Sequence, residues 1–272
     1  NTCVIEVQYV PTVNGATNDD VDLDYDDGTL IAPVTASMTL QGNADNPAVL
    51  NVQGADPTDF GTAAVGATVP MLLTLENTGN IAASGITSGG LATVNYQYTG
   101  GTYPGGGTCV EGGSLAAGAT CTFSVDFTPQ GAGTLTDTLT LSYNDGAAAQ
   151  VESHGVTGVG ANPAALGIAA VPDAFNYGNV AVSTSVDHEF TITNTGDVMA
   201  TGITEITLAA PFTMPGGFPG AGATVACGPT LASGASCNIV VRFAPLAPGA
   251  VNADITLQYN NGANLVTSSV TL

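Results

Sequence analysis

Apolar and polar residues alternate along short segments of this chain with a period of two. The seven residues from Cys121 to Phe127 read CTFSVDF, so the odd positions are apolar and the even positions are polar. The segments CVIEVQY, residues 3–9, and CNIVVRF, residues 237–243, follow the same pattern. Alternation over seven residues is typical of a half-buried β-strand, and no stretch of useful length has the helical period. The pattern predicts an all-β fold.

The cysteine segment occurs three times, with Cys3, Cys121 and Cys237 at 118 and 116 residues from one another. A fixed period of this length indicates tandem domains. A second strand follows each copy, as VDLDYDDG, LTLSYNDG or ITLQYNNG. Each ends in Asp-Gly or Asn-Gly, which favour a type I′ hairpin turn with positive φ at both central residues. We expect a last strand after each turn, at 31–40, 149–156 and 265–272.

The repeats set the expected domains: residues 46–161 and 162–272 are complete, and residues 1–45 are the C-terminal half of a third. The complete repeats open with NPAVL and NPAAL, and both carry Asn-Thr-Gly after an apolar strand. We expect about seven strands in each, folded as a β-sandwich. The linkers GNAD and GVGA are short, and a proline follows each, so the modules should form a semi-rigid rod.

The half-repeat would supply only the last three strands of a sandwich and would leave its apolar face exposed. Two sources could complete it. One is sequence upstream of Asn1 in a longer chain, and the other is a strand donated by another molecule. We favour the upstream sequence.

The order of these motifs resembles the abnormal-spindle/hydin-type (ASH) immunoglobulin-like repeat. The resemblance is carried by Phe-Gly or Tyr-Gly, then Asn-Thr-Gly, then LAAGATCTFSVDFTP or LASGASCNIVVRFAP. It covers residues 46–272 fully and 1–45 as the second half of a repeat. It implies tandem immunoglobulin-like modules, as in bacterial choice-of-anchor surface proteins. It also implies a non-catalytic spacer or interaction module, with no catalytic residues.

Charge excludes two classes of partner. The chain has 22 acidic residues and one basic residue, Arg242, which gives a net charge of −21. Binding to nucleic acid or to an anionic membrane surface requires basic side chains that neutralise phosphates. This chain has almost none, so we expect neither partner. No apolar run is long enough to span a bilayer, so we expect no membrane insertion.

The five cysteines indicate one disulfide in each complete repeat. Cys109 and Cys121 lie at places equivalent to Cys227 and Cys237. A bridge over so short a loop stabilises by about 3 kcal/mol in the chain-entropy model. Zinc is the rival, but two cysteines without nearby histidines make a poor site. Cys3 is unpaired in this chain, and its partner would lie upstream. Disulfides indicate an oxidising compartment, so we expect an extracellular or cell-surface protein, of bacterial origin.

An acidic cluster is the sharpest candidate site. Six aspartates lie within nine residues: Asp19, Asp20, Asp22, Asp24, Asp26 and Asp27. Carboxylates at alternate positions suit Ca²⁺, with these candidate ligands: Asp22, Asp24, Asp26 and Asp27. The alternative is a solvated strand face that discourages edge-to-edge aggregation, because Thr138, Thr140 and Ser142 occupy the same places in the next repeat. We favour the strand face and expect no cofactor.

Two function classes remain. The favoured one is a non-catalytic extracellular structural module, a semi-rigid segment of a surface stalk, fibre or filament. Its protein partners would be further copies or the continuation of a longer chain. The alternative is a ligand- or carbohydrate-binding adhesin that uses loops 99–107 or 215–226, with Tyr96, Tyr98 and Tyr103 as a sugar-stacking patch. His154 and His188 stand alone in different repeats, and no catalytic motif is present.

Overall fold

The computed structural model describes residues 2–29, 32–170 and 175–272. These residues form nineteen β-strands and a single 3-10 turn, η1 (Thr99–Gly101), with no α-helix among them. The half-repeat contributes β1 (Gly15–Tyr25) and β2 (Val34–Ala44). The predicted all-β fold is confirmed.

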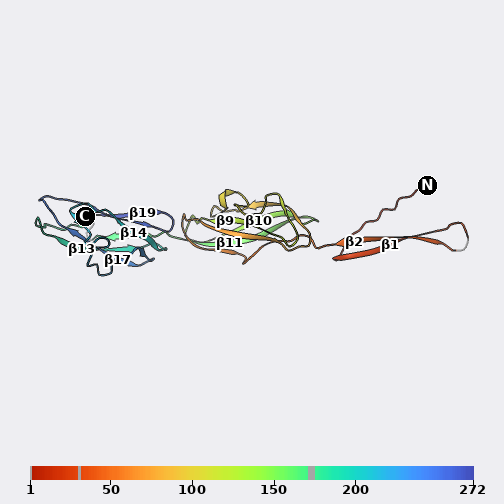
Figure 1. Ribbon diagram of the computed structural model, residues 1–272, viewed down its shortest axis with the longest axis horizontal. Helices are drawn as coiled ribbons and strands as arrows, with labels where there is room; N and C mark the ends of the chain where they lie inside the picture. The colour runs from red at the N-terminus through yellow and green to blue at the C-terminus, as the bar shows by residue number, and fades with distance from the viewer. Residues whose placement is uncertain (1, 30–31, 171–174) are drawn as a thin grey trace.

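The first complete repeat, residues 46–161, is called repeat A, and the second, residues 162–272, repeat B. The strands of repeat A are β3 (Leu50–Val52), β4 (Thr58–Ala64), β5 (Val69–Asn77), β6 (Ala83–Gly90), β7 (Tyr96–Tyr98), β8 (Gly113–Leu115), β9 (Thr120–Phe127), β10 (Gly133–Asn144) and β11 (Ala149–Ala161). Those of repeat B are β12 (Leu166–Ala169), β13 (Val186–Asn194), β14 (Ala200–Ile206), β15 (Phe212–Thr213), β16 (Thr230–Leu231), β17 (Ser236–Phe243), β18 (Asp254–Asn260) and β19 (Leu265–Thr271). The β1–β2 hairpin, repeat A and repeat B follow one another along the long axis of the molecule (Figure 1).

Each complete repeat is a sandwich of two sheets. The sheets of repeat A have the strand orders β3-β5-β9-β7 and β4-β11-β10-β6-β8. The sheets of repeat B have the orders β12-β13-β17-β15 and β16-β14-β18-β19. The described residues thus form nine and eight strands instead of about seven. The additional strands are short pieces at sheet edges, formed by loops that run beside the longer strands.

The cysteine strands, β9 and β17, lie at the centre of two separate cores. Phe123, Val125 and Phe127 are fully buried between the sheets of repeat A. Ile239 and Val241 are fully buried in the same way in repeat B. The period-two pattern therefore identified the buried face correctly, and each complete repeat buries a core of its own.

The half-repeat differs from the prediction. β1 and β2 pair antiparallel from Gly15 with Ala44 to Tyr25 with Val34, but residues 3–9 form no strand. In the complete repeats the cysteine strand bonds to β5 or β13, which come from the first half of the repeat. Residues 1–45 contain no counterpart of that strand. Ile31, where the last strand was expected to begin, lies outside the described residues.

The half-repeat also exposes the residues that the pattern directed inward. The side chains of Leu23 and Tyr25 are each 46% exposed. Their counterparts in repeat A, Leu141 and Tyr143, are buried. The apolar face of β1 and β2 thus has no second sheet to pack against within the described part of the chain.

The hairpin turns are not of type I′. Only the glycine of each pair has a positive φ: +83° at Gly28, +95° at Gly146 and +99° at Gly262. β10 and β11 are joined by four residues, 145–148, and Asp145 Oδ1 accepts the N–H groups of Ala147 and Ala148 at 2.8 and 2.6 Å. A side chain that satisfies the loop N–H groups closes a longer turn with one left-handed residue.

Candidate functional site

The predicted disulfides are present in both complete repeats. Cys109 is joined to Cys121 and Cys227 to Cys237, each pair with its Cα atoms 4.9 Å apart. Among the described residues Cys3 is unpaired and exposed. Each bridge joins the cysteine strand to the end of the loop that precedes it, so the disulfides fasten this loop to the sheet.

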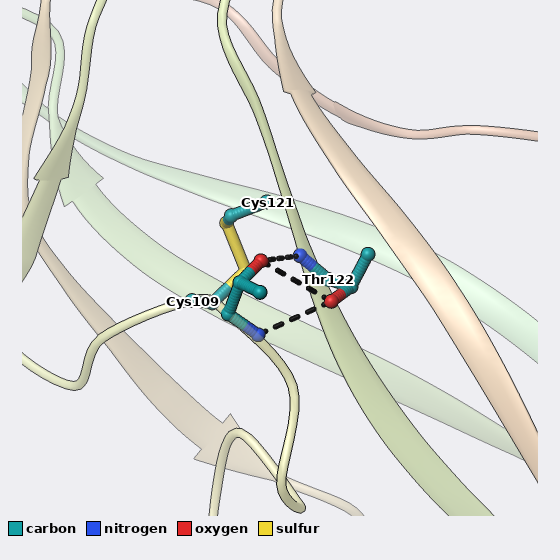
Figure 2. The surroundings of a disulfide bond; sticks show 4 residues. Cys109, Cys121 and Thr122 are labelled. Carbon is teal, nitrogen blue, oxygen red and sulfur yellow. Dashed lines mark hydrogen bonds between the residues drawn. A yellow bond between two sulfur atoms is a disulfide. The ribbon is translucent and has the colours of Figure 1, made fainter.

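In repeat A the loop lies along the free edge of β9. The N–H of Cys109 donates to the carbonyl of Thr122 at 2.9 Å. The N–H of Thr122 donates to Thr108 Oγ1 at 2.9 Å (Figure 2). Further along, the N–H of Ser124 donates to the carbonyl of Pro104 at 2.8 Å. β7 covers only the last residues of β9, and the disulfide-bonded loop covers the rest.

Repeat B uses the same arrangement with a different loop sequence. The N–H groups of Val240 and Asn238 donate to the carbonyls of Pro219 and Val225 at 2.8 and 2.7 Å. The N–H of Cys227 donates to the Asn238 carbonyl at 3.0 Å. The two loops named as candidate ligand-binding loops therefore cover exposed sheet edges, which otherwise invite pairing with other chains.

The candidate sugar-stacking tyrosines pack into the interior. Tyr96 and Tyr98 are buried in the core of repeat A. The ring of Tyr98 lies 5.3 Å from that of Tyr103 and 6.3 Å from that of Phe123, both edge to face. The buried rings of Tyr96 and Tyr98 offer no face to a sugar, so the predicted stacking patch is wrong. These residues alternate with polar ones on a strand, and the strand directs them into the core.

The Asn-Thr-Gly motif holds a buried asparagine in each repeat. Asn77 Nδ2 donates to the carbonyls of Ile81 and Leu115 at 2.8 and 2.9 Å. Its Oδ1 accepts the N–H groups of Val49 and Gly79 at 3.2 and 3.0 Å. The amide of Asn77 thus donates two hydrogen bonds and accepts two, which uses its full capacity, and the residue is not exposed to solvent.

Asn194 makes the same four bonds in repeat B. Its Nδ2 donates to the carbonyls of Val198 and Leu231, and its Oδ1 accepts the N–H groups of Ala165 and Gly196. In the sequence this motif stood out only because both repeats carry it after an apolar strand. The repetition of the asparagine at equivalent places was the signal for a larger role, because a turn alone accepts several residues.

A tyrosine joins the hairpin to the first strand of each complete repeat. The hydroxyl of Tyr143 accepts the N–H of Leu50 at 3.3 Å. The hydroxyl of Tyr259 accepts the N–H of Leu166 at 3.1 Å. These bonds link residues 93 positions apart in both repeats. They hold the start of each module to its last hairpin.

The aspartates of the candidate Ca²⁺ site have partners within the hairpin. Ser37 and Thr35 donate across the strands to Asp22 and Asp24. At the turn, Asp26 Oδ1 accepts the N–H of Gly28 at 2.8 Å. The position of Asp26 is taken by Asn144 in repeat A and Asn260 in repeat B, which accept from the equivalent glycines.

Asp27 also belongs to the turn. Its Oδ1 accepts the N–H and hydroxyl of Thr29 at 2.9 and 2.6 Å, and these bonds hold the pKa of Asp27 below its ordinary value. The described residues contain no group of three or more acidic, histidine or cysteine side chains arranged to hold a metal ion. The Ca²⁺ hypothesis stays a prediction, and the geometry assigns these carboxylates to the turn and the strand face.

The two histidines are packing residues in different repeats. His154 is buried, with Nε2 2.8 Å from Thr58 Oγ1. The ring of His188 stacks on Phe175 at 3.7 Å, and burial holds its pKa below the ordinary value. Neither histidine contacts the other. The described part of the chain also contains no helix long and apolar enough to cross a membrane.

The one basic side chain forms an exposed ion pair. Arg242 Nε and Nη2 donate to the two carboxylate oxygens of Asp187 at 2.7 and 2.8 Å. The guanidinium beside Asp187 lowers the pKa of that carboxyl. The pair bridges β13 and β17 on the outer face of their sheet. Exposed pairs of this kind contribute little to stability.

Several solved structures align with this chain at low identity. The human CEP192 ASH/PapD-like domain 7 aligns at 14% identity and a TM-score of 0.31, over 42% of this chain and 85% of that domain. A Porphyromonas gingivalis W83 protein of unknown function aligns at 13% identity and a TM-score of 0.33. The alignment covers 82% of this chain and 98% of that protein. The C-terminal domain of the Streptococcus agalactiae AgI/II polypeptide BspA aligns at 11% identity and a TM-score of 0.34. The alignment covers 83% of this chain and 99% of that domain. No curated protein matches the sequence.

The family model for the HYDIN/CFA65/VesB-like, Ig-like domain matches the chain twice, over residues 52–155 and 168–272. The two matches fall within repeats A and B and together cover most of the sequence. Both contain the cysteine strand, the buried asparagine and the hairpin tyrosine described above. The chain belongs to the HYDIN/CFA65/VesB-like Ig-like domain family.

Proposed function

We propose that this chain is a non-catalytic spacer, a semi-rigid segment of an extracellular stalk, fibre or filament. The observation that carries the proposal is the junction between the complete repeats. On the side of repeat A, the N–H of Val65 donates to the carbonyl of Ala161, the last residue of β11, at 2.8 Å, so repeat A holds the chain up to the residue before repeat B. Repeat B begins at Asn162, directly after the last residue of β11. No free linker separates the two modules, so the orientation of β11 constrains where repeat B can lie.

A contact between the two repeats limits rotation at the junction. The turn of repeat B brings Gly262 against Ala64 at the end of β4, and Ala64 is only 4% exposed. A Cβ atom built on Gly262 would lie 3.0 Å from the Cβ of Ala64. A close approach between residues of two modules restricts the angle between them more than a short linker alone.

Three features support the non-catalytic and extracellular parts of the proposal. The loops that differ between the repeats, residues 99–107 and 215–226, cover the edges of β9 and β17. Both histidines pack against neighbouring residues. The two disulfides favour an oxidising compartment. The net charge of −21 is compatible with a chain that stays extended and soluble outside the cell. The protein partners proposed are further copies or neighbouring modules of a longer chain.

Nitrogen-15 NMR relaxation of the whole chain tests the spacer role. Repeats A and B should report one common, anisotropic tumbling time, because the junction couples them. A variant with four Gly/Ser residues inserted between Ala161 and Asn162 should give shorter, separate times for the two repeats. If the unmodified chain already shows independent tumbling, the semi-rigid spacer is wrong.

A further inference from the structure

The loop that covers β9 in repeat A differs in three ways from the loop that covers β17 in repeat B, and each difference weakens its attachment. The first is access to the disulfide. Cys227 and Cys237 of repeat B are 4% and 5% exposed, whereas Cys121 of repeat A is only partly buried. Disulfide exchange needs a thiolate to reach one of the two sulfur atoms, so the bridge of repeat A is the more accessible to a thiol.

The second difference is a hydroxyl group beneath the loop. Tyr103 and Phe218 occupy the same place, since each precedes a proline whose carbonyl accepts an N–H of the cysteine strand. The ring of Tyr103 packs against Tyr98 and Phe123, with centroids 5.3 and 5.9 Å from theirs. Its hydroxyl is buried without a hydrogen-bond partner in the described part of the chain, a defect that Phe218 avoids. Such a hydroxyl favours states in which water reaches it.

The third difference is an anchor to the next strand of the sheet. In repeat B, Glu189 of β13 accepts the N–H and the hydroxyl of Thr224 in the loop at 2.6 and 2.9 Å. The corresponding residues of repeat A are Leu72 and Thr108, and the side chain of Leu72 can accept no hydrogen bond. Thr108 bonds instead to Thr122 of β9, so this part of the loop is held by β9 and by the disulfide.

Release of the loop of repeat A would uncover an edge that is complementary to itself. The N–H of Ser124 and the carbonyl of Thr122 both bond to loop residues. If β9 of a second copy lay antiparallel with the two Thr122 residues opposite each other, Thr120 of one copy would face Ser124 of the other. Hydroxyl side chains then meet on the outer face, and Cys121 faces Phe123 on the inner one. β7 already pairs with the residues after Ser124, so this pairing ends there.

We propose that β9 of repeat A is a latent pairing edge for a second copy of this chain, uncovered when a thiol reductant opens the Cys109–Cys121 bridge. A thiolate attacks Sγ of Cys121, the S–S bond breaks, and Cys109 leaves as a thiolate that takes up a proton. A second thiol displaces the first, which leaves two cysteine thiols and the reductant as a disulfide. The loop and the hydroxyl of Tyr103 become hydrated, and β9 pairs with its copy. The edge goes beyond the spacer role and does not depend on it.

Sedimentation and residue-resolved hydrogen exchange of the whole chain test the proposal. The variant Cys109→Ser/Cys121→Ser should form a dimer that the oxidised parent lacks, while association through any other surface would be the same in both. Residues 99–108 should lose exchange protection, whereas the N–H groups of Thr122 and Ser124 should stay protected in the dimer and lose protection on dilution. Mild reduction of the parent by a dithiol should give the same result.

Cys227→Ser/Cys237→Ser is the matched control in repeat B. Its state of association should stay that of the parent, because Glu189 still holds the loop and no unpartnered hydroxyl lies beneath it. Equal dimerisation of this control would show that the three differences between the loops do not govern pairing, and would overturn the assignment to repeat A.

Two single substitutions in the Cys109→Ser/Cys121→Ser chain should act in opposite directions. Tyr103→Phe removes the unpartnered hydroxyl and should lower the association constant by about fivefold or more. Gly105→Ala should raise it, because a Cβ atom there would lie 2.3 Å from the Ser124 carbonyl oxygen and push the loop away. A chain that loses loop protection but stays monomeric, or a dimer in which Thr122 and Ser124 are unprotected, would overturn the pairing edge.

Discussion

Asn77 and Asn194 show how one polar side chain organises a small sandwich. Each is buried and fully hydrogen bonded to backbone groups from three separate segments of its repeat. A buried amide is costly without partners but specifies one arrangement when every partner is in place. The asparagine thus fixes the first strand, its own turn and the loop before the cysteine strand relative to one another.

Replacing Asn77 by alanine should destabilise repeat A strongly. Two carbonyls and two N–H groups would lose their hydrogen-bond partner beside a buried side chain. The free energy of unfolding of repeat A should fall by an amount on the order of 3 kcal/mol. Chemical denaturation followed by hydrogen exchange should show that repeat A unfolds first. Repeat B should behave in the same way in Asn194→Ala.

Asn80→Ala is the matched control, because the side chain of Asn80 is exposed three residues away. It should leave the stability of repeat A within about 0.5 kcal/mol of the parent. A similar small effect of Asn77→Ala would contradict the anchoring role.

His188 should make repeat B sensitive to mild acid. Its pKa is lowered in the folded state because burial disfavours the imidazolium, so the unfolded state binds the proton more readily. Its contribution to stability is present above its ordinary pKa of 6.5 and is lost as the pH falls below that value. Repeat B should therefore lose exchange protection between pH 7 and pH 5.

The residue at the equivalent place in repeat A is Met71, which suggests the control. His188→Met should reduce the loss of protection in repeat B over this pH range, since methionine takes up no proton. An identical pH response in the parent and the variant would show that other groups cause it.

The hairpin is the element in which composition allowed two interpretations, a Ca²⁺ site or a solvated strand face. The acidic sequence of residues 19–27 suggested a metal site, yet Asp26 occupies the place that Asn144 and Asn260 fill in the other repeats. A turn of this kind needs an acceptor oxygen and not a charge. The motif was visible in the sequence, but its meaning depended on hydrogen bonds that no spacing reveals.

The double variant Asp26→Asn/Asp27→Asn should keep the β1–β2 hairpin, because an amide oxygen accepts the same N–H groups. Backbone chemical shifts of β1 and β2 should remain unchanged. Calorimetric titration of the parent with Ca²⁺ should give no heat of site binding. A saturable heat in the parent that the double variant loses would establish the metal site.

Each disulfide acts on the edge of a sheet as well as on the unfolded chain. Reduction should lower the Tm of both complete repeats, since each bridge closes a short loop worth about 3 kcal/mol. It should also increase hydrogen exchange at residues 99–108 and 215–226, which cover the edges of β9 and β17. Cys3→Ser should change neither property, and an unchanged Tm after reduction would argue against the stabilising role.

The sequence allowed the strands of the complete repeats, their tandem arrangement and the cysteine pairing to be predicted, because period-two burial and repetition are visible in the sequence. It misplaced the cysteine strand of the half-repeat, because a strand needs a partner and residues 1–45 do not contain it. It also missed the buried asparagines and the edge-covering loops. Their roles arise from contacts between segments tens of residues apart.

Across the chain, the same module is repeated. At the junction, Ala161 is bonded within repeat A, and Gly262 of repeat B lies against Ala64 of repeat A. The contact between Gly262 and Ala64 favours two sandwiches that stay in line, and Figure 1 shows the β1–β2 hairpin and the two sandwiches along one axis. An extended shape with few mobile joints is what a spacer requires. Binding modules joined by long flexible tethers would not need it.

Small-angle X-ray scattering of the chain tests this account most directly. A compact protein of 272 residues has a radius of gyration of about 19 Å. The account predicts a clearly larger radius and the profile of a rod, unchanged by moderate salt because the junction is held by packing. A radius near that of a compact particle, or the profile of freely jointed modules, would contradict it.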